Sequence, residues 1–274
     1  MPSGLRGGVE TCWTEYGSGA RDALLLHCSL AHHGAWQRVA SALGDMFRFT
    51  AFDFPGHGQS AHWDGAQDYH ATATAVARDF LREVPIDLIG HSFGATVALR
   101  LALENPGKVR SLVLVEPVLF CAARDSAPYA GLLADSERLA VCLEQGDADG
   151  AARRFFDEWG TGQEWAEQPL AKRAYASQRM HLIEASSPAL YHDTAGLLQA
   201  GKLEQLAIPV LLLEGALSPP IIGIILDRLA ERLPNARRAS VPGARHMLPV
   251  THSNETAAEI RGFYTAGMSA RNEV

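Results

Sequence analysis

The chain has 274 residues, of which 47% are hydrophobic, and its formal net charge at pH 7 is −7. This length suits one large domain or a domain with a lid, and the acidic balance without a Lys/Arg-rich run argues against nucleic acid as a partner. No apolar stretch reaches the roughly 18 residues of a membrane span, and residues 1–9 lack a signal-peptide pattern. We therefore expect a soluble cytoplasmic protein without a membrane partner.

Apolar segments of strand length alternate with helical segments along most of the chain. The expected strands are Val9–Tyr16, Ala23–His27, Phe47–Asp53, Ile86–His91, Val109–Glu116, Pro209–Gly215 and Arg237–Val241. The expected helices are Ala71–Arg82, Ala95–Leu103, Ile221–Leu233 and Asn254–Tyr264. This alternation predicts an α/β fold with a mostly parallel sheet covered by helices on both faces. Ligands of such sheets bind beyond the carboxyl ends of the strands.

One long stretch, residues 121–203, breaks the alternation because it contains no convincing strand. Helices are expected there at Tyr129–Glu144, Gly150–Trp159, Leu170–Glu184 and Tyr191–Gln199. We interpret the stretch as a helical cap over the carboxyl edge of the sheet, with residues 1–120 and 204–274 as the core domain. Large side chains of the cap either line a substrate pocket or pack the cap against the core. The pocket candidates are Phe156, Trp159 and Met180, together with Leu30 of the core.

The pentapeptide Gly90-His91-Ser92-Phe93-Gly94 stands between an expected strand and an expected helix. G-x-S-x-G in this context is typical of a nucleophile elbow, a sharp turn that exposes a serine hydroxyl above the sheet. Glycines supply the room that the turn needs, because strand and helix approach each other closely there. Ser92 is therefore the candidate nucleophile, and the alternative is an ordinary serine in a glycine-rich turn.

The cysteines and histidines give no sign of a metal or redox site. The four cysteines are widely spaced without a C-x-x-C pair, and no H-E-x-x-H pattern is present. The adjacent His32 and His33 should point apart on a helix or a strand, which argues against a shared metal ion. We expect no metal and no cofactor.

Five landmarks occur in the order typical of one family. They are Leu26-His27 with Trp36 nine residues after His27, Asp53-x-Pro55-Gly56-x-Gly58-x-Ser60, Gly90-His91-Ser92-Phe93-Gly94, Pro209-Val210-Leu211-Leu212-Leu213-Glu214-Gly215 and Gly243-Ala244-Arg245-His246. With them the chain resembles the α/β-hydrolase superfamily, in its capped branch of small esterases, lactonases and C–C bond hydrolases. The resemblance implies a mostly parallel sheet of about eight strands flanked by helices, with the cap inserted after the sixth strand. It also implies a Ser–acid–His triad and an oxyanion hole of two backbone N–H groups.

The resemblance assigns roles residue by residue. Ser92 takes the place of the nucleophile, and His246, after the last strand, takes that of the general base. The backbone N–H of Phe93 is one expected oxyanion donor. By its spacing to the tryptophan landmark, Ser29 provides the other donor, with Leu30 as the alternative. Two further histidines of the motifs are interpreted as structural, namely His57 and His91.

The usual acid of this family is missing. The position three residues after Gly215, where an aspartate is most frequent, holds Ser218, which cannot carry the charge that steadies an imidazolium. Some members of the fold take the acid from the end of the preceding strand, and here that residue is Glu116. Glu116 is therefore the candidate acid. The alternatives are Glu214, a cap residue such as Asp193, or no acid at all.

A serine nucleophile suits attack on a carbonyl carbon, whereas family members that attack an sp³ carbon use an aspartate. The predicted function is a cofactor-independent serine hydrolase that cleaves a small carboxylic ester or lactone through an acyl-enzyme on Ser92. One alternative is hydrolysis of an activated C–C bond in a β-diketone-like substrate. Another is a non-catalytic small-molecule receptor, which the loss of the acid at Ser218 favours. The expected partner is a small-molecule substrate, and the sequence indicates no oligomeric state.

Overall fold

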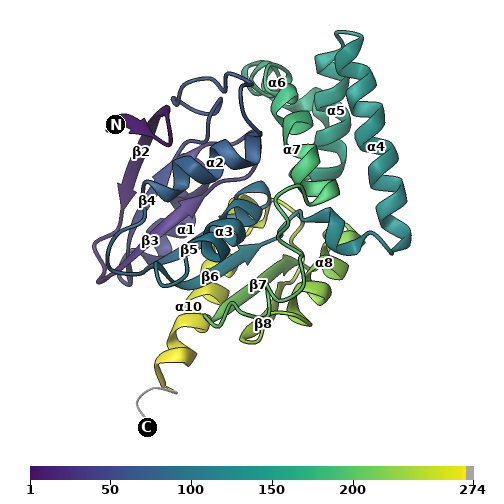
Figure 1. Ribbon diagram of the computed structural model, residues 1–274. Coiled ribbons are helices and arrows are strands. Elements are labelled where there is room, and N and C mark those ends of the chain that lie inside the picture. Colours follow the sequence, from purple (N-terminus) through teal and green to yellow (C-terminus); the bar gives the residue numbers. More distant parts are fainter. Residues whose placement is uncertain (270–274) are drawn as a thin grey trace.

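Eight strands form one sheet in the computed structural model, which describes residues 1–269 (Figure 1). The strands are β1 (Ser3–Arg6), β2 (Val9–Tyr16), β3 (Arg21–Leu26), β4 (Phe47–Phe52), β5 (Ile86–His91), β6 (Val109–Val115), β7 (Val210–Gly215) and β8 (Ala236–Val241). Their order across the sheet is β1-β2-β4-β3-β5-β6-β7-β8. The pairs β1–β2 and β2–β4 are antiparallel, and the other neighbours are parallel. The expected mostly parallel sheet is confirmed.

Helices cover both faces of this sheet. They are α1 (Gln37–Leu43), α2 (Tyr69–Arg78), α3 (Phe93–Glu104), α4 (Ala127–Glu144), α5 (Ala148–Trp159), α6 (Leu170–Ser177), α7 (Met180–His192), α8 (Pro220–Ala230), α9 (Leu248–Thr251) and α10 (Ser253–Ser269). Three 3₁₀ turns are η1 (His33–Trp36), η2 (Phe120–Ala123) and η3 (Trp165–Glu167). None of the helices within residues 1–269 combines the length and the apolar character needed to cross a bilayer.

Side chains of the central strands belong to two separate hydrophobic clusters, one on each face of the sheet. Leu112 and Leu114 of β6 pack in the cluster that includes residues of α2, α3 and α8. Val113 and Val115 of the same strand pack on the opposite face, in the cluster that includes residues of α1 and α10. Successive side chains of a strand point to opposite faces, so burial on both sides requires the continuous apolar runs seen in the sequence.

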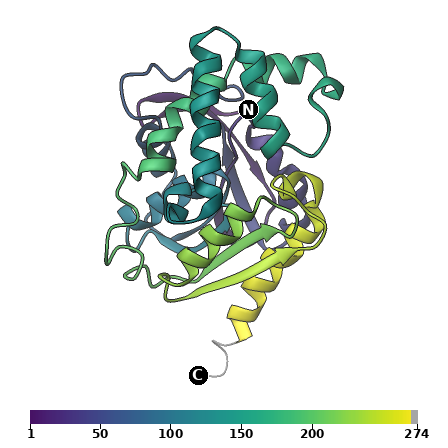
Figure 2. The same ribbon diagram turned by 90° about the vertical axis from the view of Figure 1, so that its right-hand side faces the viewer.

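The chain leaves the sheet after β6, forms α4–α7, and returns at β7. These four helices, called the cap helices below, gather at one end of the molecule, opposite the C-terminal end of α10 (Figure 2). Helices α4 and α5 begin two residues before their expected starts, and the other two expected helices differ more. The expected helix Leu170–Glu184 is two helices, α6 and α7, which are separated at residues 178–179.

The expected helix Tyr191–Gln199 is wrong. Helix α7 ends at His192, and Asp193 adopts the left-handed backbone conformation with a φ of 51°. The Asp193 carboxylate accepts hydrogen bonds from the N–H groups of Leu197 and Leu198 at 2.7 and 3.0 Å. A short acidic side chain that bonds to nearby backbone groups stabilises a turn at the expense of a helix.

Candidate active site

Ser92 lies in the turn between β5 and α3, with a backbone φ of 56° and ψ of −119°. Residues other than glycine rarely adopt such a φ, and strain at this position is typical of a nucleophile elbow. A Cβ on Gly90 would lie 2.4 Å from the carbonyl oxygen of Gly94, and a Cβ on Gly94 would lie 2.4 Å from that of His27. Both glycines are therefore required by the close approach of β3, β5 and α3.

His246 lies in the loop between β8 and α9, and its two ring nitrogens face two different side chains. Nε2 is 3.0 Å from Oγ of Ser92, and Nδ1 is 2.8 Å from Oε2 of Glu116. The backbone of this loop is held by His91, whose Nε2–H donates to the carbonyl oxygen of His246 at 2.8 Å. Burial keeps the pKa of His91 well below its usual value, so that this ring stays neutral.

Glu116 follows directly after β6, and its side chain is fully buried. Its Oε1 atom accepts a hydrogen bond from the N–H of Gly215 at 2.6 Å and another from the hydroxyl of Ser218. Its Oε2 atom faces His246. The serine at the usual acid position therefore donates to the carboxylate that faces the imidazole. The sequence pattern pointed to both residues but did not indicate this contact.

The two alternative acids lie in other surroundings. Glu214, on β7, forms an ion pair with Arg238 of β8, with a distance of 2.6 Å between Oε1 and Nη2. Asp193 caps the turn that follows α7. Within the described part of the chain, neither carboxylate is hydrogen-bonded to His246. The structure thus brings Glu116, and not these two residues, to the imidazole.

The loop after β3 holds the two residues expected to compete for the role of second oxyanion donor, Ser29 and Leu30. The backbone N–H of Leu30 donates to Nε2 of His57 at 3.0 Å, so it is not free to bind a substrate oxygen. Among residues 1–269, the backbone N–H groups of Ser29 and Phe93 have no such acceptor. Ser29 also shares a cavity wall with Ser92. The geometry thus favours Ser29 over Leu30.

Two buried histidines fix the backbone near this loop. His27 donates through Nδ1–H to the carbonyl of Cys28 at 2.7 Å and accepts through Nε2 from the N–H of Phe54 at 3.0 Å. Burial lowers the pKa of His27 to about 4 and that of His57 to about 3. Both rings are therefore neutral at pH 7 and can each accept a backbone N–H. Both histidines belong to the sequence motifs, but their hydrogen-bond partners only became clear from the structure.

Two adjoining cavities lie between the sheet and the cap helices. The smaller one, about 60 Å³, has Ser92 and Ser29 in its wall, and the larger one has a volume of about 600 Å³. Of the expected pocket residues, Leu30 and Phe156 line the larger cavity and Trp159 lines both. The cap also contributes Phe155 to both walls.

Met180 lines neither of these cavities, which corrects the expectation for this residue. It is fully buried at the start of α7, where it packs with Leu139, Trp165 and Ala176 of the cap. An unbranched, flexible side chain often fills such gaps inside a core. Spacing along the sequence did not distinguish this packing role from a place in the pocket wall.

His32 and His33 do not point apart, contrary to the expectation. Their ring centroids are 5.2 Å apart because His32 is extended while His33 begins the 3₁₀ turn η1. With Asp53 they form the one group of three metal-ligand side chains found in residues 1–269. The Asp53 carboxylate already accepts from the backbone and ring N–H of His33 and from the N–H of Gln59. These bonds occupy the carboxylate, and we assign the group a structural role.

Comparison with known proteins agrees with the fold. A family model for the alpha/beta hydrolase fold matches residues 24–253. The pimeloyl-[acyl-carrier protein] methyl ester esterase of Nitrosomonas europaea is 30% identical over 82% of this chain and 88% of its own length. The enzyme with the same name from Methylococcus capsulatus is 32% identical over 88% of this chain and 94% of its own length.

Solved structures show the same fold at low sequence identity. A hydrolase from Pseudomonas aeruginosa is 21% identical, with a TM-score of 0.74, over 94% of this chain and 95% of its own. The enol-lactonase from Burkholderia xenovorans is 18% identical, with a TM-score of 0.71, over 96% of this chain and 100% of its own. The chain therefore belongs to the α/β-hydrolase fold family and is a carboxylic ester hydrolase of that family.

Proposed function

We propose that this hydrolase cleaves a small carboxylic ester through an acyl-enzyme on Ser92, with His246 as the general base and Glu116 as the acid of the triad. The observation that carries the proposal is the continuous hydrogen-bonded series from Ser92 through His246 to Glu116, with distances of 3.0 and 2.8 Å. A serine hydroxyl in a cavity wall, an imidazole and a buried carboxylate in this order are the parts of a serine hydrolase.

The first half-reaction follows from these positions. As Oγ of Ser92 attacks the ester carbonyl carbon, Nε2 of His246 takes the hydroxyl proton. The imidazolium then donates through Nδ1–H to Glu116, whose charge stabilises it. The negative charge on the substrate oxygen is stabilised by the N–H groups of Ser29 and Phe93.

The tetrahedral intermediate then collapses. The alcohol leaves with the proton of the His246 imidazolium, and the acyl group remains on Ser92. In the second half-reaction the imidazole removes a proton from water, which attacks the acyl carbonyl. The imidazolium then returns this proton to Oγ of Ser92 as the acid is released. The sum is ester plus water to acid plus alcohol, with the enzyme regenerated.

The relatives support an ester rather than a lactone as the substrate. The relatives with 30% and 32% identity are named for a methyl ester, whereas the enol-lactonase shares 18% identity and thus only the fold. The position of Glu116 beside His246 argues against the receptor alternative, because that alternative relied on the loss of the acid at position 218.

A covalent probe tests this proposal directly. A fluorophosphonate should label the native protein, and labelling should vanish on heating or in Ser92→Ala. A panel of p-nitrophenyl esters of increasing chain length, with lactones alongside, should show ester turnover that Ser92→Ala loses. Comparable turnover by the variant would contradict the serine mechanism.

A further inference from the structure

The two cavities beside Ser92 differ about tenfold in size, at about 60 and about 600 Å³. A single water needs about 10–15 Å³ of such space, so the smaller cavity holds only a few non-hydrogen atoms. The larger cavity falls in the range of about 300–1,000 Å³ that holds a drug-sized ligand. Ser92 belongs to the wall of the smaller one.

Three residues, Ser29, Phe155 and Trp159, belong to both walls. Ser29 carries a proposed oxyanion donor, so the carbonyl of a bound ester lies where the two cavities meet. The acyl chain and the alkoxy group diverge from that carbonyl carbon. One of them enters the smaller cavity, and the other has the larger cavity available.

Trp159 is held firmly in this shared wall. It is the last residue of α5 and is 9% exposed. Its indole ring packs edge-on against His246, with centroids 4.8 Å apart, and in a tilted arrangement against Phe120, with centroids 5.6 Å apart. The N–H of the next residue, Gly160, donates to the carbonyl oxygen of Phe156 at 2.9 Å and so closes the last turn of the helix. The ring therefore acts as a fixed boundary.

Resting on the proposed ester hydrolysis, we infer that the substrate is an asymmetric ester and that Trp159 sets its size limit. One side of the carbonyl carries a group of a few non-hydrogen atoms, and the other carries a longer, mainly apolar group. The larger cavity suits the longer group because its wall includes Leu30, Phe156, Met247 and Val250. Leu190 contributes to the wall of the smaller cavity alone.

Two series of esters measure separately how long a chain the enzyme accepts on the alkoxy side and on the acyl side of the carbonyl. Methyl to hexyl hexanoates vary the alkoxy group, and hexyl acetate to hexyl hexanoate vary the acyl group. In one series the wild type should keep its kcat/KM as the chain lengthens. In the other, kcat/KM should fall at least about tenfold beyond a few carbons, because a tight apolar pocket discriminates by about 10–200-fold per methylene.

Trp159→Ala should raise kcat/KM for the long members of the restricted series, relative to the shortest, by about tenfold or more. Phe156→Ala is the matched control, because Phe156 lines only the larger cavity and its loss should leave the restriction in place. Leu190→Ala enlarges the smaller cavity without removing the ring that packs on His246. It should relax the same restriction, even where Trp159→Ala misfolds or displaces the imidazole.

Equal tolerance of long groups on both sides in the wild type would overturn the inference. So would a restriction that persists in both Trp159→Ala and Leu190→Ala. In either case hydrolysis of the short esters, lost in Ser92→Ala, would still support the proposed function. Failure of every ester, together with no fluorophosphonate labelling of Ser92, would overturn the proposed function and this inference with it.

Discussion

Two fully buried carboxylates lie at opposite ends of neighbouring central strands. One is at the carboxyl edge of the sheet, where the parallel strands end, and the other is at the amino edge, where they begin. Glu116 follows the carboxyl end of β6, and Asp87 lies at the amino end of β5. Burial of a carboxylate is costly unless charged or hydrogen-bonding partners surround it. The two edges meet this requirement with different partners.

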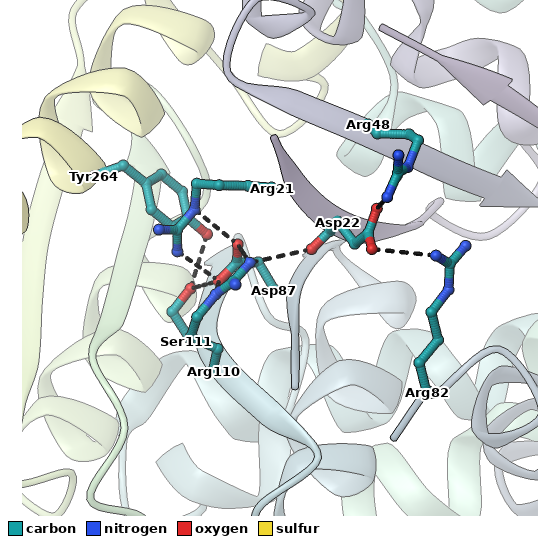
Figure 3. Close-up of polar contacts among 8 residues, drawn as sticks. All are labelled: Arg21, Asp22, Arg48, Arg82, Asp87, Arg110, Ser111 and Tyr264. Carbon is teal, nitrogen blue, oxygen red and sulfur yellow. Dashed lines mark hydrogen bonds and ion pairs between the residues drawn. The ribbon is translucent and has the colours of Figure 1, made fainter. Parts of the chain in front are cut away.

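Asp87 is surrounded by permanent cations (Figure 3). Arg21 and Arg110 each donate two hydrogen bonds to its oxygens at 2.6–3.0 Å. The hydroxyl of Ser111 donates to it at 2.7 Å and is itself bonded to the Tyr264 hydroxyl at 2.9 Å. Figure 3 also shows an adjoining ion-pair group, formed by Asp22, Arg48 and Arg82.

Glu116 has neutral donors and one titratable partner instead. A backbone N–H and the Ser218 hydroxyl occupy one oxygen, and the His246 imidazole faces the other. Guanidinium groups keep their charge at any pH at which the protein folds, so the charge around Asp87 is fixed. In the proposed reaction the His246 imidazole takes the proton of Ser92, so the charge beside Glu116 changes during turnover.

The largest expected difference between the two edges is in the effect of replacing the serine at each edge by alanine. Ser92→Ala should lower kcat for ester hydrolysis by about 10⁴–10⁶-fold, because the nucleophile is lost, and should leave the melting temperature nearly unchanged. Ser111→Ala, at the Asp87 edge, should do the reverse and lower stability by about 1 kcal/mol with normal kcat. Steady-state kinetics and thermal melts of both variants measure this contrast. Similar effects of the two changes on kcat would remove it.

Glu116→Gln sharpens the comparison by removing the charge and keeping the shape. It should lower kcat by about 10²–10⁴-fold, because an amide cannot stabilise the imidazolium and does not enforce the tautomer that His246 needs. The matched control is Glu214→Gln, which should be mild because Glu214 pairs with Arg238. A collapse of kcat in the control with normal activity in Glu116→Gln would give the acid role to Glu214.

A double variant tests whether a carboxylate at position 218, the usual place of the acid in this family, can act as the acid of the triad. In the Glu116→Gln background, Ser218→Asp should restore part of kcat, because Ser218 already contacts the Glu116 carboxylate and so lies close to the triad. Steady-state kinetics of the single and double variants make the comparison. No recovery in a double variant with a normal melting temperature would mean that a carboxylate at position 218 does not reach His246.

Asp87→Asn should act on stability rather than on rate. Removing one partner of a buried ion pair costs about 3–5 kcal/mol, and we expect about 3 here, because the guanidinium side chains are 28% and 31% exposed. The control Asp22→Asn, in the more exposed group, should cost about 1 kcal/mol or less. Urea unfolding gives both values. A large loss of kcat in folded Asp87→Asn would show that the two edges are not independent.

The carboxyl edge was far easier to predict from the sequence than the amino edge. The elbow, its helix and the strand ends follow local rules, since glycine spacing and apolar runs define them within a few residues. The buried Asp87 interrupts the apolar run Ile86-Asp87-Leu88, but no local pattern indicates which arginines meet it. Arg21 and Arg110 come from other strands, and only the sheet order brings the three together.

Other failures of the sequence analysis have the same origin. The role of Met180 depended on tertiary packing in the cap, and the turn at Asp193 depended on one side chain that competes with the helix. The occupation of the Leu30 N–H by His57 links residues 27 positions apart. Periodicity describes which face of an element is apolar, but not what covers that face.

The last expected effect concerns pH and involves the buried rings of His27 and His57, near the carboxyl edge, and of His70 on α2. Burial lowers the pKa of His27 to about 4 and of His57 to about 3, below the value of about 6.5 in an unfolded chain. Between about pH 6.5 and 4, the unfolded chain therefore binds protons that the folded chain does not. Stability should fall as the pH falls through this window, whereas the arginines around Asp87 do not titrate there.

His57→Gln tests this origin, because a glutamine oxygen can still accept the Leu30 N–H while one titrating ring is removed. The slope of unfolding free energy against pH in this window should become shallower by up to one proton, or about 1.4 kcal/mol per pH unit. Urea unfolding at several pH values between 4.5 and 7.5 measures the slope. His62→Gln, at an exposed histidine, is the control and should leave the slope unchanged. An unchanged slope in His57→Gln would mean that other groups, such as His70, cause the loss of stability in acid.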